Sequence, residues 1–470
     1  MKQRVIALLA MSAALAAAQF TNLQLTGNGY YNGEPSITVN AATVGIVYES
    51  FEFGNDEIML LASADNGNTF TAPVRITSND SASWRPKVAV NDGYDIVWED
   101  RRTGKREVFY SRCENGIPGP ALKVSDGNVY SAFPALAANG NDLFITWEDA
   151  RDGNDEIYFR KKVSGAWSAE KRLTANDSTS WGADIAFDAS TQKLHVVFFD
   201  YRTGNDEVYY LSSADLGETW SAPVNLSNDA ANSWEPRVAV FGGKTAVVWY
   251  SWDNSTTSYE VYFSENTDGT GFSAPQRISN PGADSKCPSI AMDAGATIAT
   301  WEDYQDGNDE IYAVRKPHSE SIWYQRRVTA DNSDSFGADV ALTGSDLLLT
   351  WFDYRTAVDQ IWFAKGAATD VDPVEQLTLP SSKCLRLSAS PNPFTGSVRL
   401  TVSLPAEIYK DGTRLNVWNA AGRLVYSTPL SASTASQTID WTAAGLSNGF
   451  YFVKALVGRE QASSRIILIR

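Results

Sequence analysis

Three observations predict an all-β fold class for this chain of 470 residues. First, an aromatic residue followed by an acidic turn recurs at Tyr48, Trp98, Trp147, Phe198, Trp249, Trp301 and Trp351. Second, each repeat contains four short runs of alternating apolar residues bounded by Gly, Asn, Asp and Ser, which is typical of strands. Third, no long stretch has helical periodicity. Four strands in a repeat of about 50 residues indicate a propeller blade. The sequence therefore predicts a seven-bladed β-propeller followed by a small C-terminal β-sandwich.

Residues 1–18 have the pattern of a signal peptide. Lys2 and Arg4 precede an apolar run that ends in the small residues Ala16 and Ala18, as signal peptidase requires. No later apolar stretch approaches the roughly 18 residues needed to cross a bilayer. We therefore expect an exported chain that is secreted or held at the outer-membrane surface, with no transmembrane segment in its mature part.

The predicted propeller covers residues 19–366. Its seventh repeat lacks a clear fourth strand, whereas the mature N-terminus, "FTNLQLT", resembles the fourth-strand segments "PVRITS" and "PVNLSN". An N-terminal strand that completes the last blade leaves no exposed edge. We therefore expect the two ends of this region to pair. The three cysteines are widely separated, so no disulfide framework is expected to stabilise it.

The formal net charge of −17 is unevenly distributed, because residues 381–470 carry ten Lys or Arg against four Asp or Glu. The repeat region is therefore strongly acidic. Such a surface repels phosphate backbones, which makes nucleic acid an unsuitable partner.

The recurring acidic turns are interpreted as architecture. Catalysis needs one constellation, so a carboxylate repeated in blade after blade is expected to accept turn hydrogen bonds or to pair with Arg102, Arg151, Arg202 or Arg355. The alternative is structural calcium, because the "DGNDE" turns offer several hard oxygens around a glycine. The calcium candidates are Asp152, Asn154, Asp155, Asp306, Asn308 and Asp309. The pattern requires no other cofactor.

Two turns resemble a known structural motif. "SADNGNTF" and "SADLGETW" contain Ser63, Asp65, Gly67 and Phe70, and Ser213, Asp215, Gly217 and Trp220. They resemble the Asp-box, or bacterial neuraminidase repeat, of sialidase-like propellers. The resemblance implies that these residues are structural and lie away from the active face.

The loops beside the acidic turns predict a ligand-binding face. Aromatic residues recur in them at Trp84, Trp181, Trp234 and Phe336, and the fifth repeat adds features that occur once, namely Tyr250, Trp252 and Lys286. The aromatic residues form either a partial ring of platforms for sugar rings or wedges between blades. We expect this face to bind a glycan or a protein.

An enzymatic function is left open. The resemblance to sialidases suggests a glycoside hydrolase as the alternative, and other glycosidases need only a pair of carboxylates at a suitable separation. However, the chain lacks the Arg-Ile-Pro motif that carries an arginine of the sialidase site. No catalytic residue is assigned.

The C-terminal part begins with an expected linker at residues 367–388. Residues 389–470 then contain "SPNPF", "GRLVY" and "LSNGFYFVK" before a basic end, in an order that closely resembles the type IX secretion C-terminal sorting domain. The resemblance implies that the secretion machinery is a partner of this domain. Its signature residues are Pro391, Asn392, Pro393, Phe394, Gly422 and Gly449.

Overall fold

The computed structural model describes two compact units, residues 1–377 and 378–470. The described residues are 20–127, 129–228, 230–371, 375–376, 386–390, 394–403, 413–420, 422–430, 436–457 and 460–469. The expected signal peptide at residues 1–18 lies outside them.

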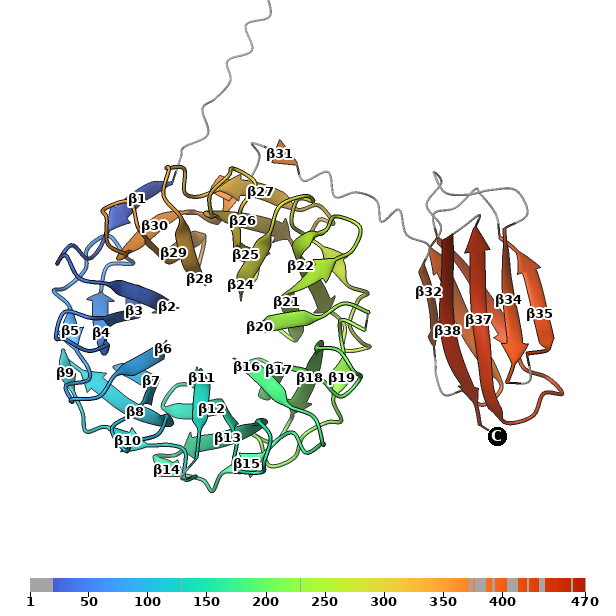
Figure 1. The fold of residues 1–470 in the computed structure, drawn as a ribbon, viewed down its shortest axis with the longest axis horizontal. Coiled ribbons are helices and arrows are strands. Elements are labelled where there is room, and N and C mark those ends of the chain that lie inside the picture. The colour runs from blue at the N-terminus through green and yellow to red at the C-terminus, as the bar shows by residue number, and fades with distance from the viewer. Residues whose placement is uncertain are drawn as a thin grey trace, which may run out of the picture. The chain divides into compact units, whose positions relative to one another are not determined.

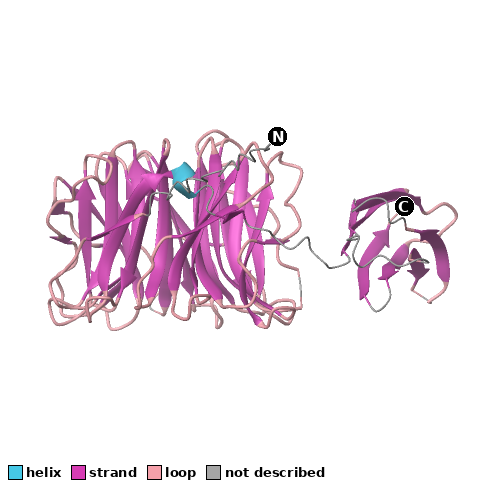
Figure 2. Cartoon of the chain, turned by 90° about the horizontal axis from the view of Figure 1, so that it is seen from above, coloured by secondary structure: helices cyan, strands magenta, loops and turns pink. Residues whose placement is uncertain are grey.

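The first unit contains seven antiparallel sheets of four or five strands each. Figure 1 shows these sheets arranged around a common axis, and Figure 2 shows their strands running between two loop-covered rims. We number the sheets 1 to 7 in the chain order of their innermost strands. The predicted all-β, propeller-like arrangement is confirmed.

Sheets 1 to 4 are built from consecutive segments of the chain. Sheet 1 has β2 (Asn32–Asn40), β3 (Thr43–Ser50), β4 (Glu57–Ser63) and β5 (Val74–Arg75); sheet 2 has β6 (Ser83–Val90), β7 (Tyr94–Asp100), β8 (Glu107–Glu114), β9 (Ile117–Pro118) and β10 (Leu122–Lys123); sheet 3 has β11 (Ser131–Asn139), β12 (Asp142–Asp149), β13 (Glu156–Val163), β14 (Ala166–Trp167) and β15 (Lys171–Arg172); sheet 4 has β16 (Ser180–Asp188), β17 (Lys193–Asp200), β18 (Glu207–Ser213) and β19 (Val224–Asn225).

Sheets 5 to 7 follow the same plan, but the last two also recruit distant segments. Sheet 5 has β20 (Ser233–Phe241), β21 (Lys244–Asp253), β22 (Ser258–Asn266) and β23 (Gln276–Arg277); sheet 6 has β24 (Ser285–Met292), β25 (Ala296–Asp303), β26 (Glu310–Pro317), β27 (Tyr324–Arg327) and β31 (Glu375–Gln376); sheet 7 has β28 (Ser335–Thr343), β29 (Asp346–Asp353), β30 (Gln360–Ala367) and β1 (Thr21–Gln24).

The N-terminal strand supplies the outermost strand of sheet 7, as the sequence predicts. Thr21 to Gln24 of β1 pair with Lys365 to Trp362 of β30. Phe20, just before β1, is buried in the apolar cluster that joins sheets 6 and 7. The strand therefore covers an edge that the seventh repeat alone leaves open.

The expected linker begins later than the sequence suggests. A 3-10 helix, η1 (Ala368–Val371), directly follows β30, and its Val371 is fully buried. Strand β31 then pairs with β27 of sheet 6. Residues 367–371 and 375–376 therefore belong to the first unit, because the burial of Val371 and the pairing of β31 with β27 hold them there.

Large aromatic side chains fill the space between neighbouring sheets. Trp98, Trp147, Trp301 and Trp351 are fully buried. Because sheets that radiate from an axis diverge outward, bulky residues are needed to keep the interior close-packed. The anchor aromatic of each repeat is thus a core residue.

The turn glutamates hold each acidic turn to its own sheet. Glu57, Glu107, Glu156, Glu207, Glu260 and Glu310 are at most 2 % exposed. Glu310, for example, accepts hydrogen bonds from Asn308 Nδ2 (3.0 Å), Arg327 Nη2 (2.6 Å) and the Thr329 hydroxyl. The predicted structural role of these carboxylates is confirmed.

The arginines named as possible partners of the repeated carboxylates pair with aspartates and not with these glutamates. Arg102, Arg151, Arg202 and Arg355 pair with the aspartates that end the second strands, Asp100, Asp149, Asp200 and Asp353. The turn places each arginine two residues after its aspartate, which brings the two charges together locally.

The second unit has two antiparallel sheets. One contains β32 (Arg386–Ser390), β33 (Ser397–Ser403) and β36 (Ser436–Thr442); the other contains β35 (Leu424–Pro429), β34 (Arg414–Asn419), β37 (Gly449–Val457) and β38 (Glu460–Leu468). Phe394, Leu400, Val417, Trp441 and Val453 are buried together in its apolar core. Across the part of the chain that the model describes, no helix is long and apolar enough to cross a membrane.

Candidate functional site

Each innermost strand has a β-bulge at the same place. The pairing of β2 with β3, for instance, shifts between Gly33 and Ser36, and each of the other six sheets has an equivalent shift. The first bulged residue has a positive φ in every sheet. These seven residues, which we call the bulge ring, are Glu34, Arg85, Phe133, Gly182, Glu235, Cys287 and Gly337, with φ between 49° and 59°.

Five members of the bulge ring are not glycine. A left-handed backbone costs a residue with a Cβ about 1 kcal/mol or more, and such strain tends to persist where a side chain has a function. Sheets 4 and 7 show that Gly182 and Gly337 satisfy the same geometry. The backbone geometry therefore does not by itself require a side chain at the other five positions, although Arg85 pairs with Glu99 and lies over the ring of Phe133.

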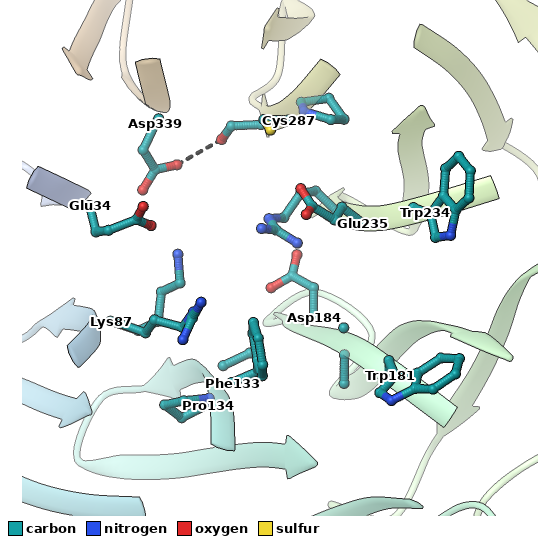
Figure 3. A pocket seen from close by; sticks show the side chains of 18 of the residues that line it. Glu34, Lys87, Phe133, Pro134, Trp181, Asp184, Trp234, Glu235, Cys287 and Asp339 are labelled. Atoms are coloured by element: carbon teal, nitrogen blue, oxygen red, sulfur yellow. Dashed lines mark hydrogen bonds between the residues drawn. The ribbon is translucent and has the colours of Figure 1, made fainter. Parts of the chain in front are cut away.

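All seven members of the bulge ring line one cavity of about 1200 Å³ in the first unit. The bulges lie near the ends of the second strands, so the cavity shares its rim with the acidic turns. Figure 3 shows Glu34, Lys87 and Asp184 pointing toward the centre from different sheets. The cavity is thus lined at a position where the side chains of the repeats differ.

The charged lining is of both signs. Glu34, Asp184, Glu235 and Asp339 face a cavity that is also lined by Arg85, Lys87 and Arg237. Asp339 accepts hydrogen bonds from the backbone N–H of Ile37 (2.9 Å) and from the hydroxyl of Ser289 (2.7 Å), which ties sheets 1 and 6 to sheet 7. Asp184 accepts one from the N–H of Val238 (2.9 Å) in the next sheet. The lining carboxylates therefore support the ring as well as facing the cavity.

A second set of carboxyl groups, the carboxyl ring, lies directly behind the bulges. Its members are Glu49, Glu99, Glu148 and Glu302, which are at most 9 % exposed. Each accepts a hydrogen bond from a bulge N–H of the following sheet; Glu148 binds Gly182 at 2.6 Å and Glu302 binds Gly337 at 2.7 Å. These groups join neighbouring sheets beside the cavity.

Burial raises the pKa of the carboxyl ring. Desolvation is the largest cause in each case, and it raises the pKa of Glu49 and of Glu148 to about 8 and that of Glu302 to about 7. The pKa of Glu99 is also raised by desolvation, although Arg85 and Arg106 act against the shift. Glu148 and Glu302 line the cavity itself. The site thus contains carboxyl groups that remain protonated near neutral pH.

Three of the predicted aromatic residues line the cavity. Trp181, Trp234 and Phe336 do so, but they are half-buried and packed on Phe199, Tyr250 and Phe352, respectively. The indole N–H groups of Trp181 and Trp234 are bound by Asp155 (3.1 Å) and Asp206 (2.8 Å) of the preceding sheet. Each of these residues therefore packs between sheets and also lines the cavity, and a role as a platform for a sugar ring stays a prediction.

The other predicted contact residues are not among those that line the cavity. Trp84 is held by Asp56 (2.8 Å) and lies near the guanidinium group of Arg106. Tyr250 and Trp252 both pack edge-on against Tyr259 in an aromatic cluster of sheet 5. Lys286 lies 3.5 Å from Asp284. A binding role of these four residues stays a prediction.

The calcium candidates form hydrogen bonds with separate protein groups. Asp152 accepts a hydrogen bond from the Tyr158 hydroxyl (2.6 Å), and Asn154 donates to Glu156 and to two backbone carbonyls. The second turn repeats these contacts, with Asp306 bound to Tyr312 and Asn308 to Glu310. Among the described residues, no group of three or more His, Cys, Asp or Glu is arranged to hold a metal ion. These contacts favour the turn role, and calcium stays a prediction.

The two Asp-box-like turns lie at the opposite rim. Asp65 accepts hydrogen bonds from the N–H and hydroxyl of Thr69 and from the hydroxyl of Ser63, and Asp215 has the same contacts within its turn. These bonds lower the pKa of Asp65 to about 2. Phe70 and Trp220 pack edge-on against Phe363 and Phe159 of the preceding sheets.

The glycines of these turns cannot carry a side chain. Gly67 and Gly217 have φ of 76° and 85°, and a Cβ there would lie 2.7 Å and 2.4 Å from the rings of Phe363 and Phe159. The contacts of these turns therefore join neighbouring sheets. Their assignment to the Asp-box family stays a prediction.

The sorting signature is partly described. Phe394 is buried and exchanges backbone hydrogen bonds with Ile467 and Ile469, while Gly422 and Gly449 adopt positive φ beside strands. Pro391, Asn392 and Pro393 lie outside the described residues.

The sequence contained a signal for the cavity that the repeat comparison passed over. In four repeats the bulge residue directly follows a loop aromatic. The bulge residues precede proline in five repeats, at Pro35, Pro86, Pro134, Pro236 and Pro288, and alanine in the two glycine repeats, at Ala183 and Ala338. At the bulge position the repeats thus have either a varied residue before proline or glycine before alanine. This pattern marks a position where the backbone conformation is fixed while the side chain varies.

Comparison with protein families identifies the C-terminal unit. Residues 388–469 match the family model of the secretion system C-terminal sorting domain. The chain carries a type IX sorting domain. It is therefore exported by type IX secretion and is released or attached to the cell surface. No curated protein matches the chain.

Several solved structures are similar to this chain over different shares of its length. An ulvan lyase bound to a glucuronate–sulfated rhamnose saccharide is 9 % identical, with a TM-score of 0.52 over 73 % of this chain and 98 % of its own. A second polysaccharide lyase is 10 % identical, with a TM-score of 0.49 over 71 % and 90 % of the two chains. A Trypanosoma rangeli sialidase mutant is 10 % identical, with a TM-score of 0.46 over 97 % and 90 %. At these identities the likeness to the ulvan lyase shows a shared fold alone.

Proposed function

We propose that this exported protein binds a saccharide in the central cavity of a closed seven-bladed propeller. The observation that carries the proposal is the bulge ring, in which five of seven residues keep a side chain at a left-handed position where two sheets use glycine. All of them line the same cavity. A ligand contact explains why the strain is retained at these positions.

The chemistry of the lining suits a polyhydroxylated ring. Saccharide hydroxyl groups both donate and accept hydrogen bonds, and the cavity offers carboxylates such as Glu34 and Asp184 beside cations such as Lys87 and Arg237. Phe133, Trp181, Trp234 and Phe336 add apolar surface on which a sugar ring can pack. A concave site with a few convergent polar groups favours a saccharide over a flat protein surface. The ulvan lyase of similar fold is also a saccharide-bound protein.

The proposal is tested by glycan-array binding of the full mature chain, followed by calorimetry on the glycans that bind. Glu34→Gln and Lys87→Met keep the shape of the lining but remove its charge, and we expect each to weaken binding by about tenfold or more. Lys193→Met is the matched control, because Lys193 begins β17 at the opposite rim and is exposed. Normal binding by both cavity variants, or no binding to any glycan, contradicts the proposal.

A glycoside hydrolase is the second candidate, and the raised pKa values of Glu148 and Glu302 favour it. A carboxyl group that is protonated near neutral pH can act as a general acid, and both groups line the cavity. Release of reducing ends from bound glycans, abolished by Glu148→Gln or Glu302→Gln, supports the enzyme. Unchanged glycans after prolonged incubation support binding alone.

A further inference from the structure

A repeated position at the cavity rim carries exposed aromatic side chains. It is the first residue of each acidic turn, three residues after the anchor aromatic. Phe51, Tyr201, Tyr304 and Tyr354 are 46 %, 49 %, 50 % and 54 % exposed at this position. In sheet 5 the same position holds the half-buried Trp252. We call these five residues the aromatic arc.

The acidic turn itself does not require an aromatic residue there. Each turn of this kind is closed by a hydrogen bond from a residue three positions later to the carbonyl of its first residue, for example from Gly204 to Tyr201 at 3.0 Å. Arg101 in sheet 2 and Ala150 in sheet 3 accept the equivalent bond at 2.8 Å and 3.2 Å. The hydrogen bond that closes the turn therefore forms whichever side chain occupies the first position. The turn does not explain why exposed aromatic rings recur there.

The members of the arc come from neighbouring sheets on one side of the rim. Its residues come from sheets 4, 5, 6, 7 and 1, which are consecutive in the ring because β1 and β2 connect sheet 7 to sheet 1. Sheets 2 and 3 break the arc with Arg101 and Ala150. Large aromatic residues gathered on one face indicate a binding surface, whereas isolated ones do not.

We propose that the aromatic arc binds an extended, uncharged polysaccharide chain, one segment of which occupies the central cavity. This proposal rests on the proposed saccharide binding and adds the length and charge of the ligand. The arc and the cavity share one rim, so a polymer in the cavity continues over the arc. Separate platforms around a rim suit successive sugar rings of a chain better than they suit a compact ligand.

Charge selects a neutral polymer. The turns that carry the arc also carry carboxylates, such as Asp206 between sheets 4 and 5 and Asp309 between sheets 6 and 7, in a chain with a net charge of −17. A long polyanion is repelled by such a rim. A neutral chain avoids this repulsion and still packs on the aromatic rings.

The test is affinity electrophoresis of the full mature chain in gels that contain laminarin, xylan or galactomannan, with alginate and polygalacturonate as polyanionic comparators. The double variant Tyr304→Ala/Tyr354→Ala is compared with wild type and with Phe241→Ala. Phe241 is 44 % exposed at the end of β20 that lies away from the bulge, which makes it a control on the opposite rim.

We expect at least one neutral polysaccharide to retard the wild type and the Phe241→Ala variant equally. The double variant is expected to bind that polymer about five- to tenfold more weakly, because two stacking platforms are lost. Its affinity for a di- or trisaccharide of the same polymer, measured by calorimetry, is expected to be unchanged, since so short a ligand fills only the cavity.

Different failures are distinguishable. If cavity variants weaken short-saccharide binding while the double variant binds the polymer normally, the arc proposal is overturned and the proposed function stands. Retardation by the polyanions alone also overturns it. If neither short nor long saccharides bind, the proposed function fails with it. If the double variant instead abolishes self-association of the chain in gel filtration, the arc is a protein interface and the proposal is wrong.

Discussion

The acidic turns and the bulge ring lie next to each other on every sheet. The turns repeat the same side chain from sheet to sheet, whereas the bulges repeat only the same backbone geometry. The turn glutamates are nearly identical from sheet to sheet, are buried, and accept hydrogen bonds from their own turn and from the outer-strand region of the same sheet, as Glu310 does from Asn308 and Arg327. The bulge ring repeats its backbone geometry but contains two acids, one base, a phenylalanine, a cysteine and two glycines. The buried glutamates show that a repeated, buried side chain builds this fold, whereas the repeated bulge with its varied side chains is where we propose that a ligand binds.

The largest expected effect is on the architectural side. Glu310→Ala removes a buried carboxylate and leaves Asn308, Arg327 and Thr329 without their shared partner. We expect the free energy of unfolding to fall by about 3–5 kcal/mol in denaturant titration. The matched control is Glu310→Gln, because sheet 7 has Gln360 at this position, and it is expected to cost much less. Equal losses for the two variants contradict a role for the hydrogen-bonding shape of the side chain.

Removing a side chain from the bulge ring is expected to raise the free energy of unfolding, whereas removing a turn glutamate lowers it. Glu34→Gly relieves the left-handed strain at φ of 49° and is expected to raise the free energy of unfolding by about 0.5–1 kcal/mol while weakening saccharide binding. Gly182→Ala is expected to lower it by about 1–3 kcal/mol, since a Cβ would lie 2.6 Å from the Phe199 ring. A stability loss in Glu34→Gly breaks the comparison, because it makes this side chain structural.

The carboxyl ring lies between these two cases and sharpens the comparison through pH. Glu148 has a pKa of about 8 in the folded protein, above that of an exposed glutamate, so folded chains hold a proton that unfolded chains release. Stability from this group is therefore full at about pH 4 and is lost as the pH rises toward 8. Each such group changes the free energy of unfolding by up to about 1.4 kcal/mol per pH unit. Glu148→Gln is expected to flatten the decline between pH 6 and pH 8 in thermal unfolding; an unchanged slope contradicts the assigned shift.

Calcium is expected to have the smallest effect. The candidate oxygens of the acidic turns already contact protein groups, so only a weak site remains for the ion. Binding with millimolar affinity contributes about 0.4 kcal/mol when calcium equals the dissociation constant. We therefore expect melting temperatures in 1 mM calcium and in chelator to agree closely. A rise of several degrees in calcium indicates a structural ion in these turns.

The architecture was predictable because the residues that build each sheet recur at a regular spacing in the sequence. The spacing of the anchor aromatics predicted the sheets, and the unmatched "FTNLQLT" predicted the pairing of β1 with the last sheet. The partners of Arg151 were not predictable, since Glu156 and Asp149 both lie within a few residues and only the turn geometry selects Asp149.

The site was predictable only in part, for a different reason. Trp181 and Trp234 were found because aromatic residues recur there, but Glu34, Arg85 and Asp184 do not recur. Their significance depends on a backbone conformation and on the convergence of distant segments, and neither is visible in a comparison of repeat letters. Similarly, Tyr304 and Tyr354 looked like ordinary turn residues until their exposure was known.

The pairing of Thr21–Gln24 with Trp362–Lys365 has a consequence for how the chain is made. The two partners are separated by nearly the whole repeat region, so synthesis delivers one of them first and the other only after all intervening sheets exist. Bringing ends together over some 340 residues carries an entropic cost of about 5 kcal/mol. Strand β1 can therefore pair only after β30 has been made, and a truncated product that lacks β30 leaves β1 without its partner strand.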